Sequence, residues 1–201
     1  MAVKKLVEVW DGKNIIKDNV IFLKQKTKEV INHNSEELKK IKKDLLDTYQ
    51  ATPCAGVAAN QIGYDKRVFI GLKKDDENDD KNNNPIGNPN AENYEFYINP
   101  QIDHYSKKSI QEGEEGCLSI PEIRLVAERF DQIKVRYFNG NGKKIKKPLS
   151  GFLSRLFQHE LDHLDGKLML ENNQIKQVYQ ITENKNIKQL YSNLIQELKS
   201  F

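Results

Sequence analysis

Cysteine is scarce in this chain, with only Cys54 and Cys117 among 201 residues. Two thiols cannot form the framework of disulfides that holds a small secreted protein together, so a reducing compartment is favoured. The first ten residues lack the apolar core and the small-residue cleavage site of a secretory signal. No apolar run approaches the length that spans a bilayer. We therefore expect a cytoplasmic protein with no membrane partner.

A strong excess of one charge is also absent, because 32 Lys and Arg face 29 Asp and Glu and leave a net charge of +3. This balance gives no reason to expect a direct nucleic-acid site. The hydrophobic fraction is 37%, which is low for a compact globule and predicts a sizeable share of solvated loop. The most polar stretch is 73–93, which we expect to be a flexible insert between strands, not a domain boundary.

The hydrophobic pattern predicts an α+β fold in which mostly antiparallel sheets pack around a central helix. Helical spacing indicates amphipathic helices at 36–49, with Asn34 in a capping box, and at 185–200. The central helix is expected to begin after Ser150 and to end near Gly166. Predicted strands lie at 67–72, 94–98, 132–138 and 143–147, the last two joined by a turn at 139–142. We expect one domain at 1–170, which 171–201 extends as a C-terminal helix.

The central helix carries a His-Glu-x-x-His pattern at His159, Glu160 and His163. Residues four apart lie on one face of a helix, so the two imidazoles can bind one metal ion. Glu160 can then reach a water molecule at that ion as a general base. The pattern predicts a hydrolytic metal centre that needs further residues from elsewhere in the chain.

Two other stretches can supply those residues. Catalytic centres of the zinc type usually have three protein ligands and one open position. Cys117, which follows the flexible Gly116, is the candidate third ligand because a thiolate binds divalent metals strongly. Gln61 is a polar side chain in a stretch of small apolar residues, and its amide N–H is a candidate donor to an oxyanion.

Together, the three stretches resemble the motifs of peptide deformylase. That family has a glycine-rich motif ending in Ala-Ala-x-Gln, then Glu-Gly-Cys-Leu-Ser, then Gln-His-Glu-x-Asp-His. The same patterns occur here, in the same order, at 56–61, 115–119 and 158–163. The similarity covers roughly 3–170, which would be the catalytic domain. It implies a cytoplasmic bacterial enzyme that removes formyl groups from N-formylmethionyl peptides, on nascent chains at the ribosome.

The resemblance also implies a role for each site residue. Cys117, His159 and His163 would bind one divalent ion, natively Fe²⁺, with Zn²⁺, Ni²⁺ or Co²⁺ as possible substitutes. Glu160 would be the general base and acid. Gln61 and the backbone N–H of Leu118 would bind the oxyanion. Substrate contacts would come from Gly56, Ala55, Phe152 and Arg124. We expect Arg129 to form an ion pair with Glu115 beneath the metal-binding loop.

The glycine-rich motif departs from the family pattern at two positions. Cys54 replaces its first glycine, and Ala55 replaces a bulky aliphatic residue that walls the methionine pocket, so a roomier pocket is expected. Two alternatives stay open. A general metallopeptidase would share the helix motif, with an open cleft. A non-catalytic zinc module would use Cys54 as a fourth ligand and close the site, although Cys54 is expected to be a small buried apolar residue.

Overall fold

The computed structural model describes residues 3–75 and 87–198. Along the chain the elements are α1 (Lys17–Leu23), α2 (Glu36–Ala51), β1 (Gly56–Ala58), the 3-10 helix η1 (Ala59–Ile62), β2 (Val68–Gly71), β3 (Glu95–Tyr105), β4 (Ile110–Cys117), β5 (Ile120–Phe130), β6 (Ile133–Phe138), β7 (Lys144–Leu149), α3 (Gly151–Leu164), the 3-10 helix η2 (Met169–Glu171), β8 (Ile175–Gln180) and α4 (Ile187–Leu198). None of the described helices combines the length and hydropathy needed to cross a membrane.

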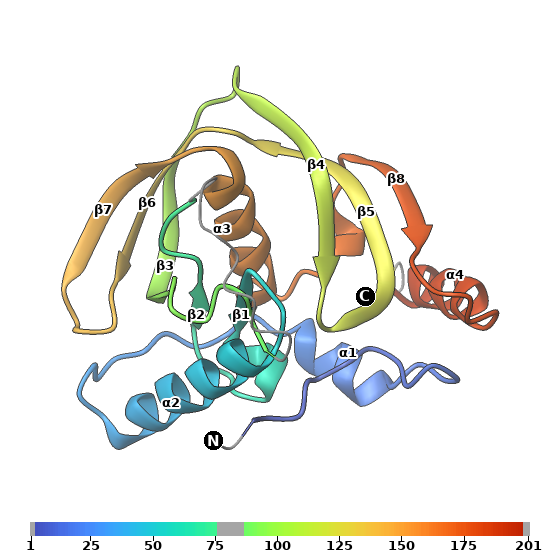
Figure 1. The fold of residues 1–201 in the computed structure, drawn as a ribbon, viewed down its shortest axis with the longest axis horizontal. Coiled ribbons are helices and arrows are strands. Elements are labelled where there is room, and N and C mark those ends of the chain that lie inside the picture. The colour runs from blue at the N-terminus through green and yellow to red at the C-terminus, as the bar shows by residue number, and fades with distance from the viewer. Residues whose placement is uncertain (1–2, 76–86, 199–201) are drawn as a thin grey trace.

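Two antiparallel sheets enclose helix α3 (Figure 1). The five-stranded sheet has the order β1-β2-β3-β6-β7, and the three-stranded sheet has the order β4-β5-β8. Figure 1 shows α3 between the sheets, with α2 below the first sheet and α4 beside β8. The expected α+β fold, with antiparallel sheets around a central helix and a C-terminal helix, is confirmed.

The apolar residues form three clusters that follow this arrangement. One cluster lies between α2 and strands β1 and β2, and includes Leu38, Leu45 and Val57. A second cluster packs α3 on strands β2, β3 and β6 through Phe157 and Leu161. The third cluster joins the N-terminal segment, β5 and α4. Helix α3 is therefore held from several sides, which fixes the face that carries the two histidines.

Several predicted elements agree with the structure, and three details do not. Helix α2 is capped by Ser35, whose side chain accepts a hydrogen bond from the Leu38 N–H, and not by Asn34. Strand β3 continues well past the predicted end at Ile98. The segment after Leu170 contains strand β8 as well as a helix, and β8 pairs with β5. This pairing makes the C-terminal part of the chain a member of the smaller sheet.

The polar insert predicted at 73–93 is anchored at its C-terminal end. Residues 76–86 lie outside the described residues. Asn88, however, is buried, and its side-chain amide donates to the carbonyls of Tyr49 and Cys54, both at 2.9 Å. Asn93 likewise bonds the backbone of Lys74. Asparagine side chains thus supply contacts at 88–93 where the sequence lacks apolar residues. The flexibility of the insert stays a prediction.

Candidate metal centre

Helix α3 presents His159 and His163 on one face, with ring centroids 5.0 Å apart. The helix begins after Ser150, but the Ser150 side chain makes no capping hydrogen bond. Instead, the N–H of Gly151 donates to Asp131 Oδ1 at 2.9 Å, with Gly151 at a φ of +57°. The chain leaves the helix through Gly166, whose φ is +72°. A left-handed residue at each end lets the chain turn sharply, as glycine permits.

Cys117 reaches the histidines from the end of strand β4. The ladder between β4 and β5 shifts register between Gly116 and Cys117, which turns the cysteine out of the regular strand. Its Sγ lies 3.2 Å from His163 Nε2. One ligand atom from each of Cys117, His159 and His163 lies within 4.8 Å of the others. The structure thus contains a Cys-His-His metal-binding group, as the motifs predicted.

The two cysteines differ in their ionisation. Burial alone would raise the pKa of Cys117, but His163 and His159 outweigh it and lower that pKa to about 5. Burial and the nearby Glu160 raise the pKa of Cys54 to about 12. At neutral pH, Cys117 is therefore a thiolate, the form that binds metals, whereas Cys54 remains a thiol.

A cluster of buried charges holds the ring of His159. Glu115 Oε2 lies 3.0 Å from His159 Nδ1, which leaves Nε2 as the nitrogen for the metal. Its other oxygen accepts hydrogen bonds from Arg129 and Arg155 at 2.8 and 2.7 Å. Burial would raise the pKa of Glu115, but His159 and Arg129 outweigh it and hold the pKa well below its usual range. An ionised carboxylate that fixes a ligand histidine in this way raises its basicity and sets its orientation.

The ion pair between Glu115 and Arg129 confirms the sequence prediction, but the role of Arg155 was missed. Arg155 lies four residues before His159 and is buried, with its guanidinium also bonded to the carbonyls of Gln111 and Ala127. An arginine on the face of a helix that carries metal-binding histidines was the available signal. Its partner could not be read from the sequence, because Glu115 lies on another element.

Glu160 is 3% exposed, and its Oε2 has no hydrogen-bond partner among the residues that the structure describes. Burial raises the pKa of this carboxyl to about 7, against the opposing effect of His159 and His163. Gly56 on strand β1 leaves room for the carboxylate. A carboxyl with a pKa near 7 can both accept and donate a proton at neutral pH.

Gln61 faces the metal-binding group with its amide nitrogen. The side-chain oxygen accepts a hydrogen bond from the Ala58 N–H at 2.9 Å, which fixes the orientation of the amide. The Nε2 group lies 3.2 Å from Ser119 Oγ and 3.6 Å from Cys117 Sγ. Ser119 is buried and was not singled out from the sequence. The arrangement directs a hydrogen-bond donor toward the point where the ligands meet.

These groups surround a cavity of about 440 Å³. Of the ten predicted site residues, nine line this cavity: Ala55, Gly56, Gln61, Cys117, Leu118, Arg124, Phe152, His159 and Glu160. The tenth, His163, is buried behind them against Cys117. Phe152 and Arg124 lie at the exposed rim, where Arg124 pairs with Glu114 at 3.3 Å. Cys54 also lines the cavity but does not belong to the metal-binding group.

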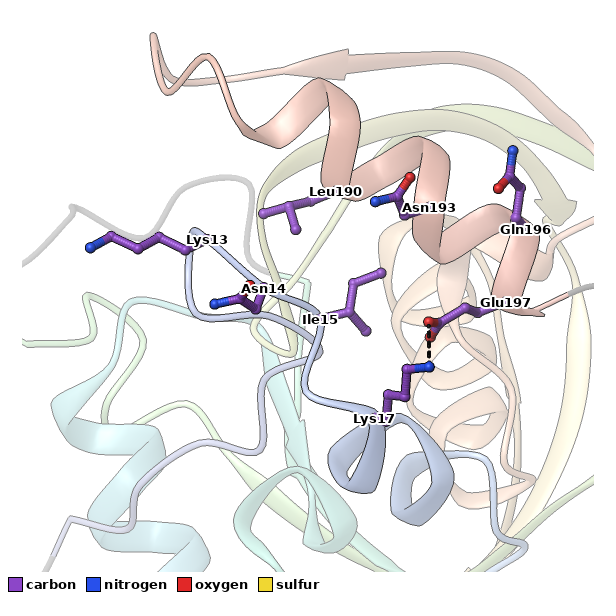
Figure 2. Close-up of a pocket in the computed structure, with 8 residues that line it drawn as sticks. All are labelled: Lys13, Asn14, Ile15, Lys17, Leu190, Asn193, Gln196 and Glu197. Carbon is purple, nitrogen blue, oxygen red and sulfur yellow. Dashed lines mark ion pairs between the residues drawn. The ribbon is translucent and has the colours of Figure 1, made fainter.

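A second cleft, of about 530 Å³, lies between the loop before α1 and helix α4 (Figure 2). Lys17 and Glu197 form an ion pair across it at 3.5 Å, and the other lining residues are neutral apart from Lys13. None of the residues that line it belongs to the metal-binding group. The predicted metal-binding and acid–base residues are therefore gathered at the cavity beside α3 and not in this cleft.

Comparisons with known proteins agree on one family. The family model described as polypeptide deformylase matches residues 12–178. A peptide deformylase of Rickettsia typhi is 34% identical over 149 residues, which cover 74% of this chain and 80% of that protein. The crystal structure of a Thermotoga maritima peptide deformylase is similar with a TM-score of 0.66 at 31% identity, covering 86% of this chain and 98% of the other. A Met-Ala-Ser-bound class I type b peptide deformylase of Acinetobacter baumannii has a TM-score of 0.67 at 28% identity, with coverages of 85% and 98%.

Proposed function

The chain belongs to the polypeptide deformylase family, and from this premise we infer that it removes the formyl group from peptides that begin with formylmethionine, releasing formate. One observation carries the inference. The Cys-His-His group lies beside a cavity that a buried, proton-accepting Glu160 also lines. These are the parts that metal-assisted hydrolysis of an amide requires.

The donor set fits a divalent metal ion at Cys117, His159 and His163. One thiolate and two imidazoles suit metals of intermediate softness, and three protein ligands with an open position are typical of catalytic sites. The unpartnered Oε2 of Glu160 supports an open position, because a buried carboxylate needs a partner. A cation held there would act as a Lewis acid and would make water a nucleophile near neutral pH. Fe²⁺ is the proposed native ion, and Zn²⁺, Ni²⁺ or Co²⁺ would fit the same ligands.

Glu160 is the proposed general base and acid. Its carboxylate accepts a proton from the attacking water, and the carboxylic acid so formed then donates that proton to the leaving amine. The pKa of about 7, which burial produces, supports both steps because neither protonation state is far from the working pH. Gln61 Nε2 and the backbone N–H of Leu118 are the proposed donors to the negative charge on the formyl oxygen. The hydrogen bond that fixes the amide of Gln61 means that this donor is already oriented.

The peptide is proposed to lie along strand β1, which is an edge strand of the larger sheet. An edge strand can pair with an extended peptide through its backbone. Gly56 lies on this strand beside Glu160, and Ala55 precedes it on the cavity wall. We place the methionine side chain against Ala55 and Phe152, and the peptide beyond it near Arg124. Residues 1–170 are the proposed catalytic domain, with 171–201 an extension of it.

The two alternative functions are less well supported. A closed four-ligand module would need Cys54, which lies outside the group of converging ligand atoms and keeps its proton. A general metallopeptidase would not require the amide donor that Gln61 directs at the ligands. We place the enzyme in the bacterial cytoplasm, acting on nascent chains at the ribosome.

Formate release from formyl-Met-Ala-Ser by anaerobically prepared, Fe²⁺-loaded protein tests the proposal. The matched control is Glu160→Gln, which keeps the size of the side chain but cannot accept the proton. We expect the variant to retain its metal and to lose about 10²–10⁴-fold in kcat. Cleavage of internal peptide bonds without formate release would favour the metallopeptidase, and metal binding without any hydrolysis would favour the module.

A further inference from the structure

The wall of the active-site cavity includes a residue from beyond the part of the chain that the family model matches. The match ends at residue 178, whereas Ile181 lines the cavity. The ladder between β5 and β8 ends where Ile123 pairs with Gln180. Ile181 therefore follows the last paired residue of β8, where the chain could turn away from the site. Pairing within the sheet does not explain why Ile181 lies at the cavity, so another contact must hold it there.

Glu122 supplies that contact by binding the segment at two points. Its backbone carbonyl accepts a hydrogen bond from the Ile181 N–H at 2.9 Å, and its carboxylate accepts one from Thr182 Oγ1. Glu122 adopts a φ of +69°, which is unfavourable for a residue with a Cβ. Such strained residues persist where the surrounding contacts hold them, and they cluster at functional sites. The two bonds thus hold Ile181 at the cavity, which Pro121 and Arg124 also line.

Ile181 leaves apolar surface free to contact a ligand. It is 52% exposed, and Phe152, on the first turn of α3, is 42% exposed on the same cavity. A β-branched isoleucine loses little conformational freedom when a ligand covers it. Two half-exposed apolar side chains on the rim of one cavity favour an apolar ligand group.

We propose that Ile181 forms a subsite for an apolar side chain of the substrate, at the second or third residue after the formyl group. The proposal rests on the proposed function and adds a specificity that the metal centre does not determine. Contact with Ile181 removes apolar surface of the substrate from water. Each methylene-sized group that becomes buried should raise kcat/KM about fourfold.

The test compares kcat/KM for formyl-Met-Ala-Ser with the values for formyl-Met-Leu-Ser and formyl-Met-Ala-Leu. In the wild type, kcat/KM for at least one leucine peptide should be about fourfold or more higher than kcat/KM for formyl-Met-Ala-Ser. Ile181→Ser should bring the ratio of these two kcat/KM values close to one. The matched control is Ile31→Ser, since Ile31 is 88% exposed and does not line the cavity, and this variant should keep the wild-type ratio.

A second variant tests the contact that holds Ile181. Thr182→Val removes the hydroxyl that binds Glu122 but no apolar surface, so the ratio should fall part of the way; an unchanged ratio would overturn the role of this contact. A wild-type ratio near one, or an Ile181→Ser variant that keeps the full ratio, would overturn the subsite while leaving the deformylase activity intact. Absence of formate release from all three peptides would overturn the proposed function and the subsite with it.

Discussion

Gly56 and Glu160 approach so closely that a Cβ on residue 56 would lie 2.7 Å from Glu160 Oε1. Attractive contact between non-bonded heavy atoms begins at about 3.5 Å, so a side chain there would displace the carboxylate. Leu156, whose Cδ1 would lie 2.9 Å from the same Cβ, leaves no room on the other side. The glycine on β1 therefore determines where the proposed general base on α3 can lie.

Gly56→Ala should reduce turnover while the metal stays bound. The added methyl group moves the Glu160 carboxylate, and a misplacement of about 1 Å can cost about 10²-fold in rate. The measurements are kcat for formyl-Met-Ala-Ser and metal content per chain. A variant with wild-type kcat would show that Glu160 either tolerates the shift or is not the base.

Glu115→Gln should weaken metal retention. The amide cannot carry the charge that holds His159 Nδ1, and loss of such a supporting carboxylate typically lowers metal affinity by about 10–100-fold. Competition with a chelator measures the affinity. Glu114→Gln is the matched control, because Glu114 is the preceding residue but pairs with the exposed Arg124 at the rim. Equal metal loss in both variants would mean that general charge, and not the contact with His159, is responsible.

Among the described residues, periodicity in the sequence predicted helices α2, α3 and α4 but not α1, and four strands of the larger sheet (β2, β3, β6 and β7) but not β1. Helix α2 and strand β6 bury one regular face each, and that pattern is visible without a structure. Strand β4 was not predicted, because its buried face is formed by polar residues such as Glu115. Burial of a charged residue depends on partners that are distant in the sequence, so local patterns do not reveal it.

The site shows the same limit. The motifs identified Cys117, His159 and Glu160, because thiol, imidazole and carboxyl side chains can bind metals or transfer protons wherever they occur. Arg155 and Ile181 were missed because their roles arise only from position: one meets Glu115 from another element, and the other is held at the cavity by Glu122. Contacts between distant segments require the fold itself.

Cys117→Ser and Cys54→Ser should separate the two cysteines. A hydroxyl is a harder and poorer ligand than a thiolate, so Cys117→Ser should lose metal and change which metal it prefers. Cys54→Ser should do neither, since the Cys54 thiol stays protonated and lies outside the metal-binding group. Metal-to-protein ratios after dialysis against Fe²⁺, Co²⁺ or Zn²⁺ provide the comparison. Equal loss of metal from both variants would favour the closed four-ligand module as the function.

Asn88→Ala should destabilise the fold. The buried amide donates to the carbonyls of Tyr49 and Cys54, and its removal leaves both acceptors without this donor. The expected loss in the free energy of unfolding is about 1–3 kcal/mol, which denaturant titration can measure. The exposed Asn173 provides the control, and Asn173→Ala should stay within about 0.5 kcal/mol of the wild type. An equally small effect of Asn88→Ala would mean that the hydrogen bonds of Asn88 do not stabilise the fold.

Ala55 should leave the methionine pocket roomier than a bulky aliphatic residue would. The small side chain lines the cavity beside Gly56, at the place where we put the substrate methionine. We expect the wild type to discriminate weakly between formyl-Met and formyl-Phe peptides, and Ala55→Ile to sharpen the preference for methionine. An added methylene in contact with the flexible thioether contributes about 0.8 kcal/mol, whereas the same bulk against a rigid ring overpacks the site at a cost of about 1–3 kcal/mol. The ratio of kcat/KM for the two peptides is the measurement, and Ala51→Ile, at the exposed end of α2, is the control for added bulk alone. Strong rejection of formyl-Phe by the wild type would mean that another side chain, such as Phe152, already fills the space.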